Sequence, residues 1–524
     1  MAQIHIYLKA VALSIGISFL TGCVQHETFY VTGLACENLR EPMGINTCKP
    51  RFSWKNKSDQ QGANQTAYQL LVASSIRHLN DDNGNYWDSG KIESPDISAE
   101  YNGKSLQSGQ LLFWKIRTWD EHGKVSKWSK PSSFSIGLLN KEDWEASYIG
   151  YPSEKGFYAC PQLRKEFSIT KKKNDTYLLH VNSLGYHEVY INGDKVGEDV
   201  LSPAVSQFNK RSLIVTYNVT SLLKGGNNEL IIWLGSGWYT EGLPGVTGSG
   251  PVVRAQLEHV NEEAKEIVVS TDDSWVGRNS EYERISNWRS GRYGGEIVTG
   301  NLEARNKALQ TPDALTWEKV IIAEVPEHEA SPQMVEPNRI METIQPYRIE
   351  RLNDSTYLVD MGRCISGWFE ITFPPLQESS EIIMEYSDHL TENGELRGQG
   401  QIDRYIASGN GTEMFKNKFN YHGFQYIKIS NLETPPRLED IKAHLIHTNF
   451  ETTASFECSD DDLNRIHDMV SYTLRCVGLG GYLVDCPQIE RLGYGGDGNA
   501  STITAQTMFN MAPLYNNWLQ AWSD

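Results

Sequence analysis

The residues best suited to chemistry in this sequence are three carboxylic acids in one short segment, residues 485–497. Asp485, Glu490 and Asp497 share this segment with Pro487 and several glycines. Any one acid in a glycine-rich loop is usually a solvated turn residue. Proline restricts the backbone and glycine allows close approach, so a cluster of acids there can surround a ligand. The segment therefore predicts a site where carboxyl groups could act on a bound ligand.

Helical patterns flank this acidic loop. Before it, apolar residues recur at helical spacing behind the N-cap candidates Ser459 and Asp460, and Gly478 to Gly481 end the run. The apolar positions are Leu463, Ile466, Val470, Leu474 and Val477. After the loop, a second helical stretch is expected from Ala500 to Trp522.

The chain before residue 455 has strand patterns. Short alternating runs separated by Gly, Asn, Asp and Ser clusters predict a small β-sandwich from about 29 to 139 and a second from about 144 to 320. In the second, Asn192-Gly193-Asp194 predicts a hairpin turn. Residues 323–337 are typical of a connector, and strand patterns from 357 to about 447 predict a third sandwich.

Bulk properties limit the class of partner. A chain of 524 residues is too long for one core and predicts three or four domains. Its formal charge of −18 repels phosphate backbones, so nucleic acid is a poor partner. The 14 Trp and 25 Tyr could stack on sugars, although core packing explains single aromatic residues equally well.

The N-terminus has the pattern of a processing signal. Lys9 supplies positive charge, and Ala10 to Leu20 form an apolar run too short for a stable membrane span. Leu20-Thr21-Gly22-Cys23 resembles a bacterial lipobox, in which the cysteine becomes the lipidated N-terminus. The alternative is an ordinary secretory signal with an incidental cysteine. We expect residues 1–23 to be a lipoprotein signal peptide, and the mature protein to be exported and anchored to the cell envelope, in the periplasm or at the cell surface.

Cysteine spacing predicts no metal site. Eight cysteines are scattered without CxxC pairs, which makes zinc unlikely. Without Cys23 an odd number remains, so no disulfide framework is implied, and Cys36 with Cys48 is the one pair worth testing.

The acidic loop is similar to a known signature. It resembles the Asp-Cys-Pro-Gln-Arg-Glu-Arg-Leu-Gly-Trp-x-Gly-Asp segment of bacterial α-L-rhamnosidases, inverting glycoside hydrolases with a six-hairpin α/α catalytic toroid. Two positions depart from that signature: Ile489 replaces the usual Arg, and Tyr494 replaces the usual Trp. The acids are retained, and the departures affect the shape and charge of the sugar pocket.

Upstream blocks follow the order of the same family. Residues 50–54, 65–69, 87–91 and 114–120 resemble its fibronectin III-like module, 190–193 and 234–239 its jelly roll, and 360–362, 366–368 and 421–426 its next β-sandwich. The resemblance implies a multidomain fold of three β-sandwiches followed by the start of an α/α toroid. The expected domains are fibronectin III-like (28–141), jelly roll (142–322), concanavalin-like sandwich (338–448) and the beginning of the toroid (455–524).

The resemblance also implies roles for the loop residues. Glu490 would be the general acid, kept protonated near neutral pH by burial and by the charges of Asp485 and Asp497. Those two aspartates would bind sugar hydroxyls. Arg491 would orient an acid or a hydroxyl, or form a plain ion pair, and Tyr494 would face the sugar or belong to the core.

Inverting hydrolysis needs a second carboxylate, about 6.5–9.5 Å from the acid, that activates water. In the family it lies later in the toroid, which needs on the order of 200 residues. The sequence therefore predicts an α-L-rhamnosidase polypeptide that acts on terminal α-L-rhamnose of glycans or glycosides but is truncated and inactive alone. The alternatives are a surface-anchored carbohydrate-binding protein and another six-hairpin glycosidase. No cofactor is expected to be required, calcium in the jelly roll is conceivable, and the oligomeric state is open.

Overall fold

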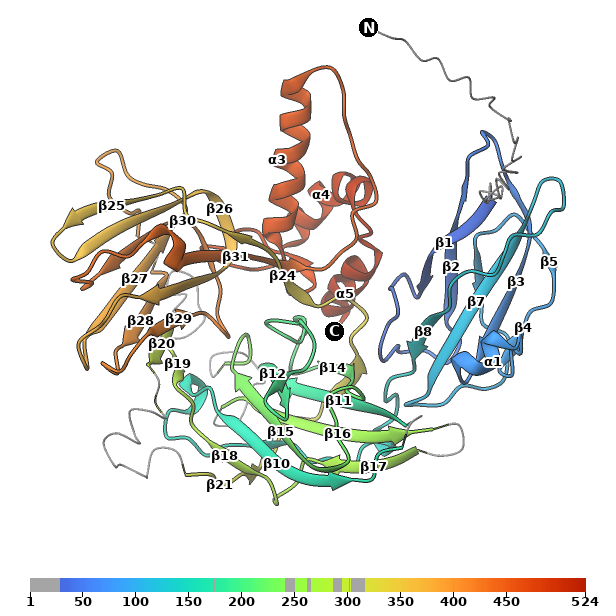
Figure 1. Cartoon of the computed structure of the whole chain (residues 1–524), viewed down its shortest axis with the longest axis horizontal. Coiled ribbons are helices and arrows are strands. Elements are labelled where there is room, and N and C mark those ends of the chain that lie inside the picture. Colours follow the sequence, from blue (N-terminus) through green and yellow to red (C-terminus); the bar gives the residue numbers. More distant parts are fainter. Residues whose placement is uncertain are drawn as a thin grey trace, which may run out of the picture.

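Strands dominate the chain up to residue 448, and helices follow (Figure 1). The structure is a computed structural model that describes residues 29–172, 175–240, 250–261, 265–285, 295–300, 302, 316–398 and 400–524. The expected fold class is confirmed, because three β-sandwich units precede a helical segment. In Figure 1 the C-terminal helices, coloured orange to red, stand between the first sandwich (blue) and the third (yellow to orange), above the second (green).

The first sandwich packs two antiparallel sheets around buried aromatic rings. Phe52 and Trp114 lie with ring centroids 4.6 Å apart, one from each sheet. Cys36 is buried and Cys48 is half-buried, and both are free thiols, so the disulfide considered for them is not formed. The strands are β1 Phe29–Cys36, β2 Arg51–Ser58 and β6 Ser98–Glu100 in one sheet, and β3 Gln65–Ala73, β4 Trp87–Asp88, β5 Ile92–Glu93, β7 Leu111–Asp120 and β8 Ser132–Ser135 in the other, with helix α1 Ile76–Asn80 beside it.

The second sandwich contains the predicted hairpin. Asn192 and Gly193 both have positive φ, 54° and 90°, and join β12 to β13 as the Asn-Gly pair predicted. One sheet has the order β13-β12-β15-β10-β18-β21 and the other β22-β9-β16-β11-β14-β23, with β17 beside β16. The bounds are β9 Ile149–Gly150, β10 Gln162–Ile169, β11 Thr176–Leu184, β12 Tyr186–Ile191, β13 Asp194–Lys195, β14 Arg211–Asn218, β15 Gly226–Gly235, β16 Val252–Val260, β17 Lys265–Ser270, β18 Val276–Arg278, β21 Glu318–Lys319, β22 Ile321–Ile322 and β23 Glu329–Pro332.

The third unit is one ten-stranded sheet that curves around its own core. Its central strand β26 pairs with four others, and its register shifts between Asp360 and Ile365. The strands run β19 Tyr282–Arg284, β20 Glu296–Thr299, β28 Ile402–Ile406, β27 Glu381–Ser387, β30 His422–Ser430, β26 Thr356–Phe373, β31 Ile441–Thr448 and β24 Asn338–Ile344, with β25 Arg348–Asn353 and β29 Glu413–Lys416 beside β26.

Pairing crosses the expected boundary between the second and third units. Strands β19 and β20 fall inside residues 142–322, yet β20 pairs in parallel with β28 of the third sheet. Residues 323–337, expected as a connector, include β23, which pairs in parallel with β14. Strand patterns locate strands in the sequence but do not identify their partners, because pairing is decided by tertiary packing.

The helical segment differs from expectation in one respect. Helix α3 (Asp461–Val477) is capped by the Asp460 side chain, as predicted. The stretch expected from Ala500 to Trp522 is two helices, α4 (Gly495–Met508) and α5 (Ala512–Ser523), because Pro513 lacks an N–H and begins a new helix. A short hairpin of β32 Gly478–Leu479 and β33 Tyr482–Leu483 precedes the acidic loop. None of the helices in the described ranges could span a membrane.

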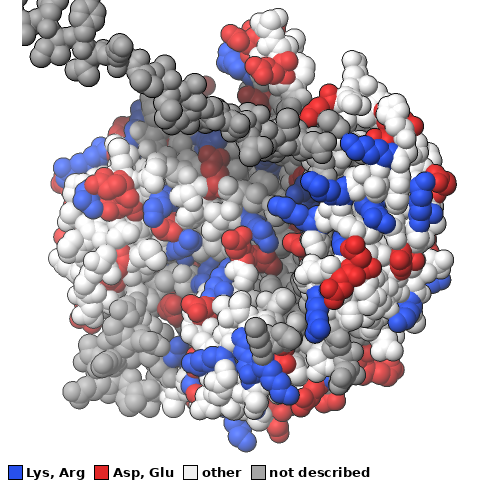
Figure 2. All heavy atoms as spheres, turned by 45° about the vertical axis from the view of Figure 1, so that its right-hand side comes forward, with Lys and Arg blue, Asp and Glu red and all other residues white. Residues whose placement is uncertain are grey.

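One hydrophobic cluster joins the second sandwich, the third sandwich and the helices. It contains Trp233, Trp368, Phe419, Tyr482 and Trp518, among other residues of all three parts. A cleft of about 790 Å³ lies between the first sandwich on one side and the second sandwich and the C-terminal helices on the other. The ion pair between Arg40 and Glu451 borders this cleft. Figure 2 shows this hollowed face, on which acidic and basic side chains are interleaved.

The packing of Gly235 against Phe419 gives a test of the contact between the second and third units. A Cβ on Gly235 would lie 2.3 Å from the Phe419 ring, so Gly235→Ala should lower the free energy of unfolding by about 1–3 kcal/mol. Gly225→Ala is the matched control, since its Cβ would meet no atom within 4 Å. Equal denaturant midpoints for the two variants would contradict this interface.

Candidate functional site

The acidic loop is closed by Asp485. Its backbone N–H donates to Leu492 O at 2.8 Å, and Leu492 N–H donates to Asp485 Oδ1 at 3.0 Å. The Cys486 thiol donates to Asp485 Oδ2, and burial together with this carboxylate raises the pKa of Cys486. Asp485 therefore holds the start of the loop against Leu492, in addition to any role toward a ligand.

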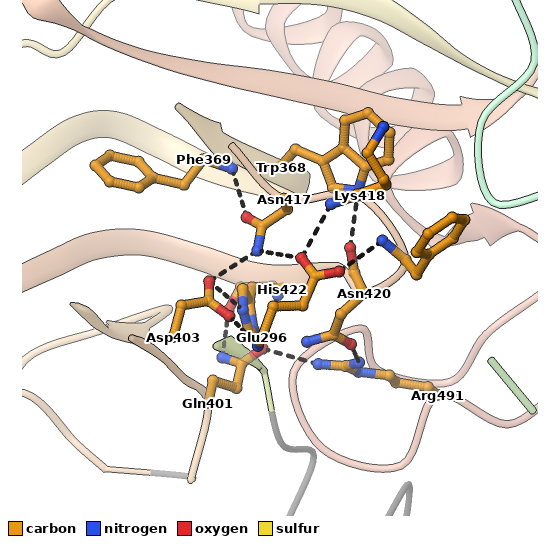
Figure 3. A network of polar contacts seen from close by, with 12 residues as sticks. Glu296, Trp368, Phe369, Gln401, Asp403, Asn417, Lys418, Asn420, His422 and Arg491 are labelled. Carbon is orange, nitrogen blue, oxygen red and sulfur yellow. Dashed lines mark hydrogen bonds and ion pairs between the residues drawn. The ribbon is translucent and has the colours of Figure 1, made fainter. Parts of the chain in front are cut away.

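Arg491 anchors the loop to the third sandwich. Its side chain is fully buried, with the guanidinium carbon 4.4 Å from the Tyr421 ring centroid. It donates to Asn420 Oδ1 at 3.1 Å and to Gln401 Oε1 at 3.3 Å (Figure 3). It also donates to Pro487 O at 2.8 Å.

Burial narrows the roles expected of Arg491, which were to orient an acid or a hydroxyl or to form a plain ion pair. Its side chain is closed off from solvent, and the partners named above are uncharged, so a direct contact with a substrate hydroxyl is not supported and the role of orienting the acid stays a prediction. Its backbone φ of 59° lies in the left-handed region, which costs roughly 1–3 kcal/mol and persists only where the surroundings enforce it. Arg491 therefore positions the loop.

A second layer of buried polar groups fixes the residues that hold Arg491 (Figure 3). Glu296 accepts from the backbone N–H groups of Lys418 and Phe419 at 2.9 and 2.7 Å. Asn417 Nδ2 bridges Glu296 and Asp403, and His422 Nε2 lies 2.9 Å from Asp403. Segment 417–422, which carries Asn420, is thus tied to strands β20 and β28.

The two buried carboxyl groups in this layer differ electrostatically. Burial, followed by the charge of Asp403, raises the pKa of Glu296 to about 8. Burial also acts to raise the pKa of Asp403, but His422 opposes it and the pKa is lowered overall. The layer therefore holds at least one ionised carboxylate, at Asp403, without exposure to solvent.

Glu490, the expected general acid, is only half-buried. Its Oε2 accepts a hydrogen bond from the Tyr494 hydroxyl, and Tyr494 is 44% exposed. Tyr494 is therefore a surface partner of the acid, and the alternative of a core role for it is not supported. Asp497 is exposed in the first turn of α4, where the helix dipole stabilises a negative charge.

The glycines after Arg491 have a packing reason. A Cβ on Gly493 would lie 2.8 Å from Trp518 Nε1, and one on Gly495 would lie 2.7 Å from the Trp522 ring. A Cβ on Gly498 would likewise lie 2.8 Å from the Trp518 ring. The indoles of Trp518 and Trp522 on α5 lie directly against the backbone that follows Glu490. A side chain in place of any of these glycines would therefore displace this backbone from α5.

Sequence reasoning missed the residues that support the loop. Gln401 and Asn420 hold Arg491, and Asp388 Oδ2 accepts from Gln488 Nε2 at 3.1 Å. They lie about 70 to 100 residues away in the sequence and belong to no local pattern. Within the described ranges, no group of three or more His, Cys, Asp or Glu side chains could hold a metal ion. Cys23 and its lipobox lie outside the described residues.

Family models match four successive parts of the chain. They are described as Rha78A-like, N-terminal immunoglobulin domain (residues 31–140), alpha-L-rhamnosidase N-terminal domain (172–342), bacterial alpha-L-rhamnosidase concanavalin-like domain (350–447) and bacterial alpha-L-rhamnosidase 6 hairpin glycosidase domain (451–524). The first unit is thus immunoglobulin-like where a fibronectin III-like sandwich was expected. Both are small β-sandwiches.

Similar proteins carry the same family name. An alpha-L-rhamnosidase of Formosa agariphila is 29% identical over 91% of this chain and 54% of its own length. One of Alteromonas sp. is 29% identical over 92% of this chain and 54% of its own length. The chain therefore spans about half the length of these relatives.

Solved structures agree with the fold. The α-L-rhamnosidase structure from Dictyoglumus thermophilum has a TM-score of 0.83 at 31% identity, covering 94% of this chain and 57% of its own. The Streptomyces avermitilis enzyme, solved with L-rhamnose, has a TM-score of 0.82 at 21% identity, covering 94% and 64%. The family models match in succession along the chain, and the acidic loop packs between the third sandwich and the helices. The chain belongs to the bacterial α-L-rhamnosidase family.

Proposed function

We propose that this chain provides the β-sandwich modules and the acid-bearing loop of an α-L-rhamnosidase, which hydrolyses terminal α-L-rhamnosides with inversion. The observation that carries the proposal is the placement of Glu490. Its side chain is half-buried, and its carboxyl group accepts a hydrogen bond from the Tyr494 hydroxyl. The next residue, Arg491, is fully buried and donates hydrogen bonds to three oxygens. A general acid needs this combination of access and fixed position.

In the proposed reaction, Glu490 donates its proton to the glycosidic oxygen as the bond to the anomeric carbon breaks. The Tyr494 hydroxyl orients the carboxyl group, and exposed Asp497 binds sugar hydroxyls. Inversion requires a second carboxylate to activate water on the opposite face of the sugar. We assign that role to no residue of this chain, so the activity is proposed for the enzyme as a whole.

We also propose that the protein is exported and lipid-anchored through Cys23. The support is the sequence Leu20-Thr21-Gly22-Cys23 behind an apolar run. An anchor at this position would hold the first sandwich, which begins with β1 at Phe29, close to the membrane surface.

The acid assignment is tested by Glu490→Gln in the protein expressed from its complete reading frame. Glutamine keeps the size but has no proton to donate, so turnover of a rhamnoside with a poor leaving group should fall roughly 100-fold or more. An activated p-nitrophenyl rhamnoside should lose much less, because its leaving group departs without protonation. Equal losses on the two substrates would show that Glu490 binds sugar and is not the acid.

The positioning role is tested by Arg491→Lys. Lysine keeps the charge but cannot reach Pro487 O, Asn420 Oδ1 and Gln401 Oε1 together, so about 1–3 kcal/mol of unfolding free energy should be lost. Displacement of Glu490 should also lower kcat about 10- to 100-fold, with the same greater loss on poor leaving groups.

Arg465→Lys on the exposed face of α3 is the control for Arg491→Lys, and it should change neither quantity. A loss of stability with no change in the dependence on leaving group would show that Arg491 supports the fold alone.

The anchor is tested by Cys23→Ser. Serine cannot accept the thioether-linked lipid, so the variant should move from the membrane pellet to the soluble exported fraction. Retention of both proteins in the pellet would contradict lipidation at Cys23.

A further inference from the structure

The thiol of Cys486 lies at the centre of the turn that carries the proposed acid. Its S–H donates to Asp485 Oδ2 at 2.9 Å, and its sulfur accepts the N–H of Glu490 at 3.4 Å. The carbonyl oxygen of Cys486 accepts the next N–H, that of Arg491, at 3.1 Å. Leu492 N–H, the third in succession, donates to Asp485 Oδ1 at 3.0 Å. Three consecutive N–H groups are therefore held by two neighbouring residues.

These contacts surround the left-handed residue of the loop. Arg491 has a φ of 59°, a conformation that persists only with support from its surroundings. On one side of it, Glu490 N–H is bonded to the Cys486 sulfur, which is its only acceptor within the described part of the chain. On the other side, Leu492 N–H is bonded to Asp485. The thiol is thus the contact that joins the backbone of Glu490 to this support.

The thiol can make both hydrogen bonds because it stays protonated. Burial, followed by the hydrogen bond to Asp485, raises the pKa of Cys486 above its ordinary value. A protonated thiol donates through its hydrogen and accepts through its sulfur, whereas a thiolate would repel the Asp485 carboxylate. Pro487 restricts the backbone of Cys486, because a proline ring disfavours the helical conformation in the residue before it. The side chain is thereby held between a carboxylate that accepts and an amide that donates.

We propose that Cys486 is a positioning residue for the general acid, because its thiol fixes the backbone of Glu490 relative to Asp485. Without the sulfur, Asp485 Oδ2 would lose a donor and the Glu490 N–H would lose its acceptor, so the turn would relax. The Glu490 carboxyl group would then be displaced from the glycosidic oxygen, and such displacements of a catalytic group lower turnover strongly. The identity of the acid rests on the proposed function.

The kinetic test compares Cys486→Ala with Cys486→Ser in the protein expressed from its complete reading frame. Alanine removes both hydrogen bonds, so kcat on a rhamnoside with a poor leaving group should fall about tenfold or more. The loss on p-nitrophenyl rhamnoside should be smaller, and KM should stay within about twofold. Serine can donate and accept, but its oxygen lies closer to the Cβ than sulfur does, so it should restore only part of the loss.

A double variant shows whether the thiol acts through Glu490. Adding Cys486→Ala to Glu490→Gln should lower kcat by less than about twofold, because the proton donor that the thiol positions is already absent. Cys458→Ala is the matched control. The Cys458 thiol is also half-buried and also donates, in its case to Asp460 O at 3.4 Å, but it lies at the start of α3. This control should change neither kcat nor KM.

Hydrogen exchange measured by mass spectrometry tests the contact without any substrate. In the 524-residue chain, the amides of residues 486–492 should exchange about tenfold faster in Cys486→Ala than in the parent, and Cys486→Ser should lie between them. Peptides from the first sandwich should exchange as in the parent, which also shows that the variant is folded.

Three outcomes would overturn the proposal. They are exchange and turnover of Cys486→Ala like those of the parent, faster exchange with unchanged kcat, and losses in Cys486→Ala and Glu490→Gln that multiply in the double variant. Failure of the acid assignment gives a different result. In that case Glu490→Gln loses equally on the two substrates, while the faster exchange in Cys486→Ala remains.

Discussion

The hydrogen bonding of the buried Arg491 guanidinium is the constraint on which the placement of the acidic loop depends. Removing a charged group from water is costly unless its donors are met by well-placed oxygens. Those oxygens come from the loop itself and from two residues of the third sandwich, Asn420 and Gln401. The loop can satisfy Arg491 only in one position relative to that sandwich. Glu490, directly before it, takes its place from this requirement.

The network around Glu296 extends the constraint to the second sandwich. Glu296 lies on β20, which leaves the sequence range of the second unit to pair with β28 of the third. Its carboxyl group accepts hydrogen bonds from the backbone N–H groups of Lys418 and Phe419. Phe419 in turn packs against Gly235 of β15. The three parts therefore share one core, in which a displacement of any one of them would leave buried polar groups without partners.

The fold class and the acidic loop could be predicted from the sequence because both depend on local order along the chain. Alternation of apolar residues, the Asn192-Gly193 turn and the Asp460 cap are local features, and the structure contains each of them. What the sequence could not reveal depends on distance in space. The partner of β20 and the burial of Arg491 are each decided by contacts with residues far along the chain, for which a single sequence holds no pattern.

The shared core has a consequence for the order of events during synthesis. Domains emerge and fold from the N-terminus onward, and residues 401–423 leave the ribosome before the loop at 485–497 does. Gln401 and Asn420, whose oxygens accept hydrogen bonds from Arg491, are therefore synthesised before the loop is. A helical unit made without the preceding sandwiches would lack the oxygens of Gln401 and Asn420 that hold Arg491, and with them the contacts that fix the position of Glu490.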